Sequence, residues 1–106
     1  MNSPSTINPQ FEKQVTPLLS EFGYQGGIKE LVQDQLTLML QSKIDHYQAE
    51  IALYRQQSGD DYEQILNYAE SATSEDFDLE DRLNDWRFAR EMLSHYQAQM
   101  AQLADD

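Results

Sequence analysis

The sequence predicts an all-α protein in which two long helices form an antiparallel hairpin. Two segments carry apolar residues at three- and four-residue spacing, and each is long enough for many helical turns. An acidic stretch that contains helix-breaking residues lies between them, and it can reverse the direction of the chain so that the two helices run antiparallel. No segment shows the alternation of apolar and polar residues that indicates a β-strand.

The length of 106 residues leaves room for one domain with a modest core. Residues 1–10 are polar and contain Pro4 and Pro9, so we expect a disordered tail there and a single helical domain over residues 11–106. A net charge of -12 and a mean hydropathy of -0.72 leave little apolar area to spare. Small helical folds with so little apolar area often bury more of it by oligomerising.

A short helix is expected over residues 17–22. Thr16 precedes it as a candidate N-cap, and Pro17 suits the first helical position. Glycines begin at Gly23 and are expected to end it.

The first long helix is expected over about residues 28–57. Its apolar stripe comprises Ile28, Leu31, Val32, Leu36, Leu40, Ile44, Tyr47, Ile51 and Tyr54. Further apolar residues lie off this stripe and suggest a second face in need of cover: Leu38, Met39 and Leu53.

A third helix is expected over residues 61–71, after a break at Ser58 and Gly59. Asp60 followed by Glu63 resembles a capping box. Residues 72–74 form the next break, and Thr73 or Asp78 could cap the helix that follows.

The last helix is expected over about residues 79–104, with Trp86 as its core anchor. Its stripe comprises Leu79, Leu83, Trp86, Ala89, Arg90, Leu93, Tyr96, Met100 and Leu103, and Phe88 and Met92 widen it. The heptad-like spacing predicts shallow antiparallel packing against residues 28–57. Because a two-helix core cannot cover this much apolar surface, we expect a homodimer that closes as a four-helix bundle.

The segment from Asp60 to Asp81 has charges of one sign only. It holds nine carboxylates and no Lys or Arg, with Tyr62, Tyr68 and Phe77 among them. Such a field attracts basic surfaces and repels nucleic acid, so a basic protein is the expected partner. The candidate partner-binding residues are Tyr62, Asp76, Phe77, Asp78, Glu80, Asp81 and Asp85.

The sequence contains no motif typical of a catalytic, cofactor-binding or metal-binding site. We therefore expect that the protein is not an enzyme and binds no cofactor. The chain has no cysteine and no glycine-rich phosphate loop. The pairs His46/Glu50 and Glu91/His95 share a helix face, but they lack the Glu-x-x-His step and the added carboxylates of bundle metal centres. The run that begins at Asp76 lacks the glycine and the final glutamate of a calcium-binding EF-hand loop, so only weak divalent binding stays open.

Targeting features are likewise absent from the sequence. Residues 1–10 lack the basic and apolar regions of a secretory signal, and no apolar run approaches the ~20 residues of a membrane span. Together with the lack of cysteine, this favours a cytoplasmic protein without membrane contact.

Several motifs together resemble a group of small acidic prokaryotic helical proteins. They are Tyr47-x-Ala49-Glu50-Ile51, Gly59 followed by Tyr62-Glu63, the acidic stretch Glu75–Phe77, and Asp85-Trp86. The likeness covers about residues 44–103. These proteins resemble antitoxin components encoded beside a small toxin, which implies neutralisation of a basic toxin by direct binding. The competing hypothesis is a self-associating structural or adaptor protein whose acidity keeps it dissolved.

Overall fold

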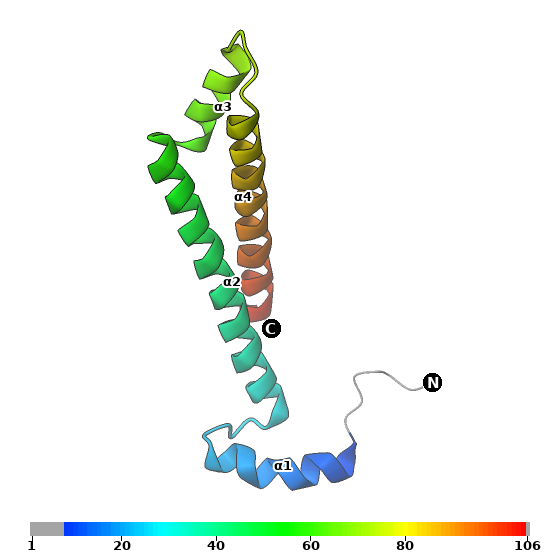
Figure 1. Ribbon diagram of the computed structural model, residues 1–106. Helices are drawn as coiled ribbons and strands as arrows, with labels where there is room; N and C mark the ends of the chain where they lie inside the picture. Colours follow the sequence, from blue (N-terminus) through cyan, green and yellow to red (C-terminus); the bar gives the residue numbers. More distant parts are fainter. Residues whose placement is uncertain (1–7, 106) are drawn as a thin grey trace, which may run out of the picture. The chain divides into compact units, whose positions relative to one another are not determined.

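The computed structural model describes residues 8–105, and every regular element in that range is a helix. The helices are α1 (Pro9–Glu21), α2 (Ile28–Ser58), α3 (Tyr62–Ser71) and α4 (Phe77–Ala104) (Figure 1). This confirms the expected all-α class and, within a few residues, both long helices.

The chain divides into two compact units, the first ending at Leu38 and the second beginning at Met39. The first unit contains α1 and the first turns of α2. The second contains the rest of α2 with α3 and α4. The single domain expected over residues 11–106 stays a prediction.

Helix α1 begins eight residues before the expected start, so the boundary of 17–22 is wrong. Asn8 is the N-cap, its side chain accepting from the Gln10 amide at 2.8 Å, and Pro9 occupies the first turn. Thr16-Pro17 carries the same start signal as Asn8-Pro9, but the chain uses the earlier one. Thr16 does not cap: its hydroxyl donates to the Glu12 carbonyl at 2.6 Å.

Part of the expected tail therefore belongs to a helix. Pro9 and Gln10 are the first residues of α1, while residues 1–7 lie outside the described range. The helix ends where expected. Gly23 has a φ of 93°, and the Tyr24 amide donates a hydrogen bond to the Leu19 carbonyl at 2.7 Å.

Two side-chain hydrogen bonds join the loop after α1 to the start of α2. The Tyr24 hydroxyl donates to Asp34 Oδ2 at 2.6 Å, and Glu30 Oε2 accepts from the Gly26 amide at 2.6 Å. The hydrogen bond to Asp34 raises the pKa of the Tyr24 hydroxyl above its usual value. Leu19 is the buried apolar residue of this unit.

In the second unit, α2 ends at the expected break. Gly59 adopts a φ of 78°, which favours glycine, and its amide donates to the Arg55 carbonyl at 2.9 Å. The expected capping box at Asp60 is wrong, because Asp61 is the N-cap residue of α3 and makes no side-chain cap bond. Asp61 instead pairs with Arg55 at 2.8 Å, and Glu63 pairs with Arg90 of α4 at 3.2 Å.

Helix α4 begins at Phe77, two residues before the expected start. Its N-cap is Asp76, whose carboxylate accepts from the Leu79 amide at 3.1 Å. Neither Thr73 nor Asp78 serves as the cap. The connector between α3 and α4 is thus as short as residues 72–76.

Trp86 is the centre of the second unit, as its stripe position predicts. It is 1% exposed and lies beside Tyr54 of α2 and Tyr62 of α3, with ring centroids 6.0 and 5.5 Å away. Leu83 and Ala89 are buried on the same side of α4. The three helices of this unit therefore meet on one tryptophan.

Aromatic rings also fill the space between α2 and α4 farther from α3. Tyr47 stacks on Tyr96 at 6.0 Å and meets Phe88 edge-on at 6.2 Å. In this unit α2 and α4 run in opposite directions, as the predicted hairpin requires (Figure 1).

Much apolar surface stays exposed. Among the described residues five hydrophobic side chains are buried, while eleven large ones are exposed, including the off-stripe Leu38, Met39, Leu53 and Phe88. Val32 and Leu36, which the stripe predicted to be covered, are exposed too. In the described part of the chain, no helix has the length and apolarity that crossing a membrane requires.

Candidate protein-binding surface

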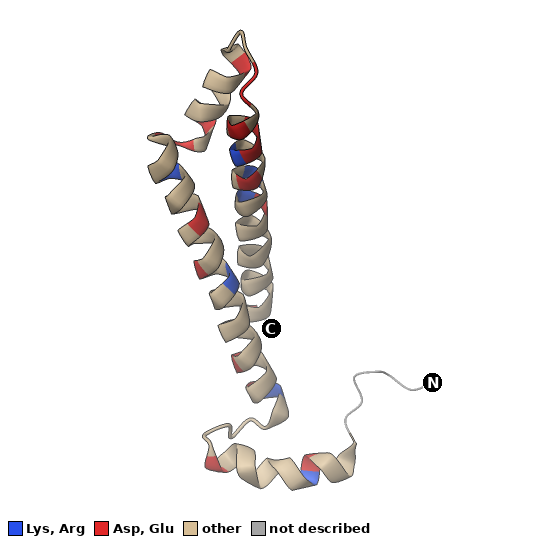
Figure 2. Ribbon diagram, viewed as in Figure 1, with Lys and Arg blue, Asp and Glu red and all other residues tan. Residues whose placement is uncertain are grey.

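Six of the seven predicted partner-binding residues lie within the N-cap and first turns of α4. We call these six the acidic strip: Asp76, Phe77, Asp78, Glu80, Asp81 and Asp85. All six are exposed. Figure 2 shows acidic residues gathered at this end of α4 and along the chain just before it.

The local sequence explains why carboxylates can gather there. The first turn of a helix presents unpaired backbone amides and the positive end of the helix dipole, which stabilise nearby negative charge. Asp76 satisfies one such amide directly, and Asp78 and Glu80 lie in the first turn. The helix therefore offsets part of the repulsion among these carboxylates.

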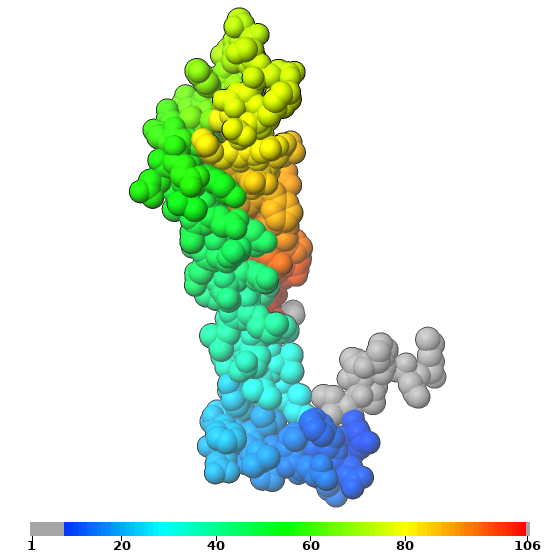
Figure 3. All heavy atoms as spheres, viewed as in Figure 1, coloured from blue at the N-terminus to red at the C-terminus, as the bar shows by residue number. Residues whose placement is uncertain are grey.

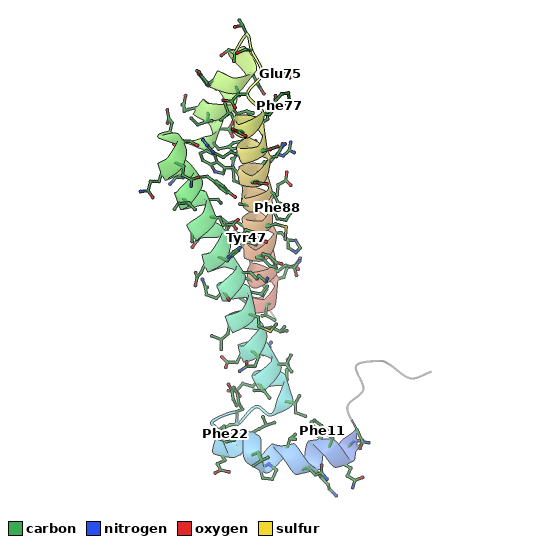
Figure 4. All side chains as sticks on the ribbon, viewed as in Figure 1. Phe11, Phe22, Tyr47, Glu75, Phe77 and Phe88 are labelled. Atoms are coloured by element: carbon green, nitrogen blue, oxygen red, sulfur yellow. The ribbon has the colours of Figure 1, made fainter. Side chains whose placement is uncertain are left out.

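An aromatic ring stands among the charges. Phe77 is a large apolar residue whose side chain is 67% exposed, whereas Leu79, two residues later, is half-buried. Figure 4 shows the Phe77 and Glu75 side chains at this end of the second unit, and Figure 3 shows the segment around residues 70–80, in yellow, open on the visible face. Among the eleven large apolar side chains that are exposed in residues 8–105, Phe77 is the one with a carboxylate directly before and directly after it in the sequence.

Tyr68 is a further candidate that the predicted set omitted. It is exposed, and it lines a hollow of about 220 Å³ where α3 ends and α4 begins, together with Glu75, Asp76 and Glu80. Its position in α3 could have identified it, because it lies off the helix face that carries Ile65 and Ala69.

Tyr62 lies at the start of α3 and not in the acidic strip. Its position therefore does not support assigning it to the same surface as the strip. It is half-buried, with its ring edge-on to Trp86 and the Arg90 guanidinium 4.3 Å from its centroid. These contacts make Tyr62 part of the packing between α3 and α4.

The nine carboxylates of residues 60–81 do not all have the same surroundings. Asp61 and Glu63 form ion pairs inside the second unit, Asp60 accepts from the Asp61 amide at 2.8 Å, and Asp76 caps α4. The other five are exposed: Glu70, Glu75, Asp78, Glu80 and Asp81. Periodicity along one helix cannot reveal this division, because it depends on which arginine the neighbouring helix presents.

Two arginines near Trp86 make side-chain contacts in the described part of the chain. The Arg90 guanidinium pairs with Glu63 of α3 at 3.2 Å and lies over the Tyr62 ring, while Arg87 donates to Asn84 at 3.4 Å.

The two histidines form no metal-like cluster. His46 Nε2 lies 3.2 Å from Glu50 Oε1 within α2, and His95 stacks edge-on with its neighbour Tyr96. Over residues 8–105, no three His, Cys, Asp or Glu side chains come together in a way that could hold a metal ion.

Comparison with known proteins adds no relative. No protein-family model, curated protein or solved structure matches the chain.

Proposed function

We propose that this chain is a non-catalytic interaction protein of the antitoxin kind, which neutralises a basic toxin by direct binding through the acidic strip. The observation that carries the proposal is Phe77, an exposed ring surrounded by exposed carboxylates at the start of α4. The resemblance of residues 44–103 to small acidic antitoxin-like proteins is the second reason for this proposal.

The two kinds of side chain have different tasks in this proposal. The carboxylates draw a cationic surface toward α4 and set its orientation, an effect that acts mainly on the association rate and weakens with salt. Phe77 then inserts into an apolar part of that surface and slows dissociation.

A basic partner also fits the chemistry of toxins that act on RNA. Such a toxin needs cationic groups around its active site to hold phosphates. A helix start with closely spaced carboxylates can occupy these groups in place of the nucleic acid. The chain itself, at a net charge of -12, is repelled by nucleic acid.

The test uses the product of the neighbouring gene in the host genome. We expect a small basic protein that binds the full chain, with an affinity that falls as salt is raised. The variant D76N/D78N/E80Q/D81N should bind more weakly, and Asn at position 76 preserves the helix cap. A matched control removes four exposed carboxylates elsewhere: E12Q/E21Q/D45N/E91Q. Equal loss in both variants, or no basic neighbour, counts against the proposal.

Phe77→Ala separates the anchor from the charges. We expect faster dissociation with little change in association rate. Phe88→Ala is the matched control, because Phe88 is an exposed phenylalanine of the same helix outside the acidic strip.

A second candidate function rests on the exposed apolar residues of α2 and α4. In a self-associating structural protein, Leu53 and Phe88 would be covered when two copies close as a four-helix bundle. Light scattering with a co-purification from the host separates the two candidates. A dimer that recovers no basic partner favours this one.

A further inference from the structure

A small hollow lies where the end of α2, the start of α3 and the middle of α4 meet, and we call it the arginine hollow. Figure 1 shows this start of α3 at the turn after α2, with the connector to α4 at the other end of α3. The hollow has a volume of about 200 Å³, below the ~300–1,000 Å³ of pockets for drug-sized ligands, so it suits a small ion. Its lining residues are Ile51, Arg55, Asp61, Tyr62, Glu63, Trp86 and Arg90.

The start of α3 offers backbone donors at this place. The first amides of an α-helix have no partner inside the helix, and a side-chain cap often satisfies one of them. Asp61 is the N-cap residue of α3 but makes no side-chain cap bond, and its carboxylate pairs with Arg55 Nε at 2.8 Å. This helix of ten residues therefore keeps uncapped amides at the positive end of its dipole.

Side chains of the hollow add further donors. Arg55 uses its Nε for Asp61, and Arg90 uses Nη1 for Glu63, so each guanidinium has N–H groups beyond its ion pair. Trp86 is 1% exposed, and its Nε1 has no hydrogen-bond partner among the described residues. A buried donor without an acceptor costs stability, so an acceptor atom that reached it would stabilise the unit.

The carboxylates of the hollow are neutralised where they lie. Asp61 and Glu63 each pair with one arginine, so the four charged side chains of the lining sum to zero, and the uncapped helix start adds a positive partial charge. The ten residues of α3 span about 15 Å, which separates the hollow from the acidic connector before α4 by more than the ~8–10 Å screening length of salt solutions.

We propose that the arginine hollow binds a phosphate-sized oxyanion. Free amides at a helix start form a ready-made anion site, and guanidinium groups match the oxygens of a phosphate. The oxyanion would accept from Arg55, Arg90 and the first amides of α3, and it would give the Trp86 indole N–H the acceptor that the described residues do not supply. Its source is either free inorganic phosphate or the terminal phosphate group of a small molecule. This site is independent of the acidic strip and of a toxin partner.

The first test uses the wild-type chain alone. Trp86 is its single tryptophan, so the isotope-labelled full chain gives one indole N–H signal in an NMR spectrum. Inorganic phosphate should shift this signal and the amide signals of Tyr62–Gln64 along one saturating curve, in the millimolar range or tighter. Sodium chloride at the same ionic strength should not. Methyl phosphate identifies the source: if it binds as well, the hollow admits a terminal phosphate group, and if it does not, the ligand is the free ion.

Variants locate the binding within the hollow. Arg55→Gln should weaken phosphate binding about tenfold, the loss expected from one hydrogen bond to a charged group. Arg87→Gln is the matched control, because Arg87 is an exposed arginine of α4 outside the hollow, and it should bind like the wild type. D76N/D78N/E80Q/D81N should also keep its phosphate binding, so this proposal and the proposed function can fail separately.

Three results would overturn the proposal. They are an indole signal that stays unchanged at tens of millimolar phosphate, an equal shift in chloride, and an Arg55→Gln variant that binds phosphate no more weakly than Arg87→Gln. Circular dichroism should show the same helix content in both arginine variants. Because the wild-type titration needs no variant, it tests the proposal even if Arg55→Gln fails to fold.

Discussion

Trp86 and Phe77 lie nine residues apart on α4 and have opposite surroundings. Trp86 is 1% exposed, and rings from the two neighbouring helices pack beside it. Phe77 is 67% exposed and has carboxylates on both sides in the sequence. One helix thus supplies both a core residue of the second unit and an exposed aromatic residue. We therefore expect substitutions of Trp86 to change stability, and substitutions of Phe77 to change binding to the proposed partner without changing stability.

The largest expected effect is that of Trp86→Ala. Because Trp86 is fully buried between three helices, its truncation should lower the free energy of unfolding by roughly 3–5 kcal/mol. Its indole Nε1 is buried without a hydrogen-bond partner in the described residues, so the loss comes from packing rather than hydrogen bonding.

Chemical denaturation followed by circular dichroism measures this effect without needing the tryptophan signal. Trp86→Phe keeps an aromatic ring and should lose less. A change below about 1 kcal/mol for Trp86→Ala would place the residue outside the core, since large buried side chains cost more than this.

Arg90→Ala should have the next effect, about 1 kcal/mol of unfolding free energy. The side chain makes one partly exposed ion pair with Glu63 and one contact over the Tyr62 ring, and each is worth a fraction of that amount. Arg90→Lys keeps the charge but not the flat guanidinium, so its unfolding free energy should lie between those of the wild type and Arg90→Ala. If Arg90→Ala melts like the wild type, Arg90 does not hold α3 in place.

A smaller effect should appear at alkaline pH through Tyr54. Burial raises the pKa of its hydroxyl, and the nearby Glu50 and Asp85 charges raise it further. A raised pKa means that the folded state favours the neutral phenol. The associated stability is therefore present below pH ~10, the usual tyrosine value, and is lost as pH rises through the folded-state value.

Tyr54→Phe removes this dependence. Between pH 9 and 12, its unfolding free energy should fall less steeply than that of the wild type. Tyr68→Phe is the matched control, because it removes a hydroxyl from an exposed tyrosine of the same unit. If the unfolding free energies of the wild type and Tyr54→Phe fall in parallel over this pH range, Tyr54 is not the cause of the alkaline loss of stability.

Regular features of the fold could be predicted from the sequence, and features that depend on contacts between helices could not. The spacing of Leu83, Trp86 and Ala89 predicts one buried side of α4, and the structure confirms it. The role of Glu63 could not be predicted, because its partner Arg90 is 27 residues away on another helix. The start of α1 was misplaced because two Asn/Thr-Pro steps carry the same start signal, and the sequence alone does not rank them.

The same distinction explains the candidate site. The acidic strip could be identified because its residues are close together in the sequence and lie at a helix start. Tyr62 was included for the same reason of sequence proximity, but its ring faces Trp86 and Arg90. Tyr68 was left out, although the structure shows that it is exposed on α3.

The most direct test of the central claim is the association rate of the acidic-strip variant with the proposed partner, the basic protein that we expect the neighbouring gene to encode. At low salt, D76N/D78N/E80Q/D81N should associate about tenfold more slowly than the wild type and with a weaker dependence on salt, because steering charges act through the association rate. Circular dichroism should show the same helix content in both. An unchanged association rate together with a lowered melting temperature would contradict the account and would mean that these carboxylates serve only to stabilise the start of α4.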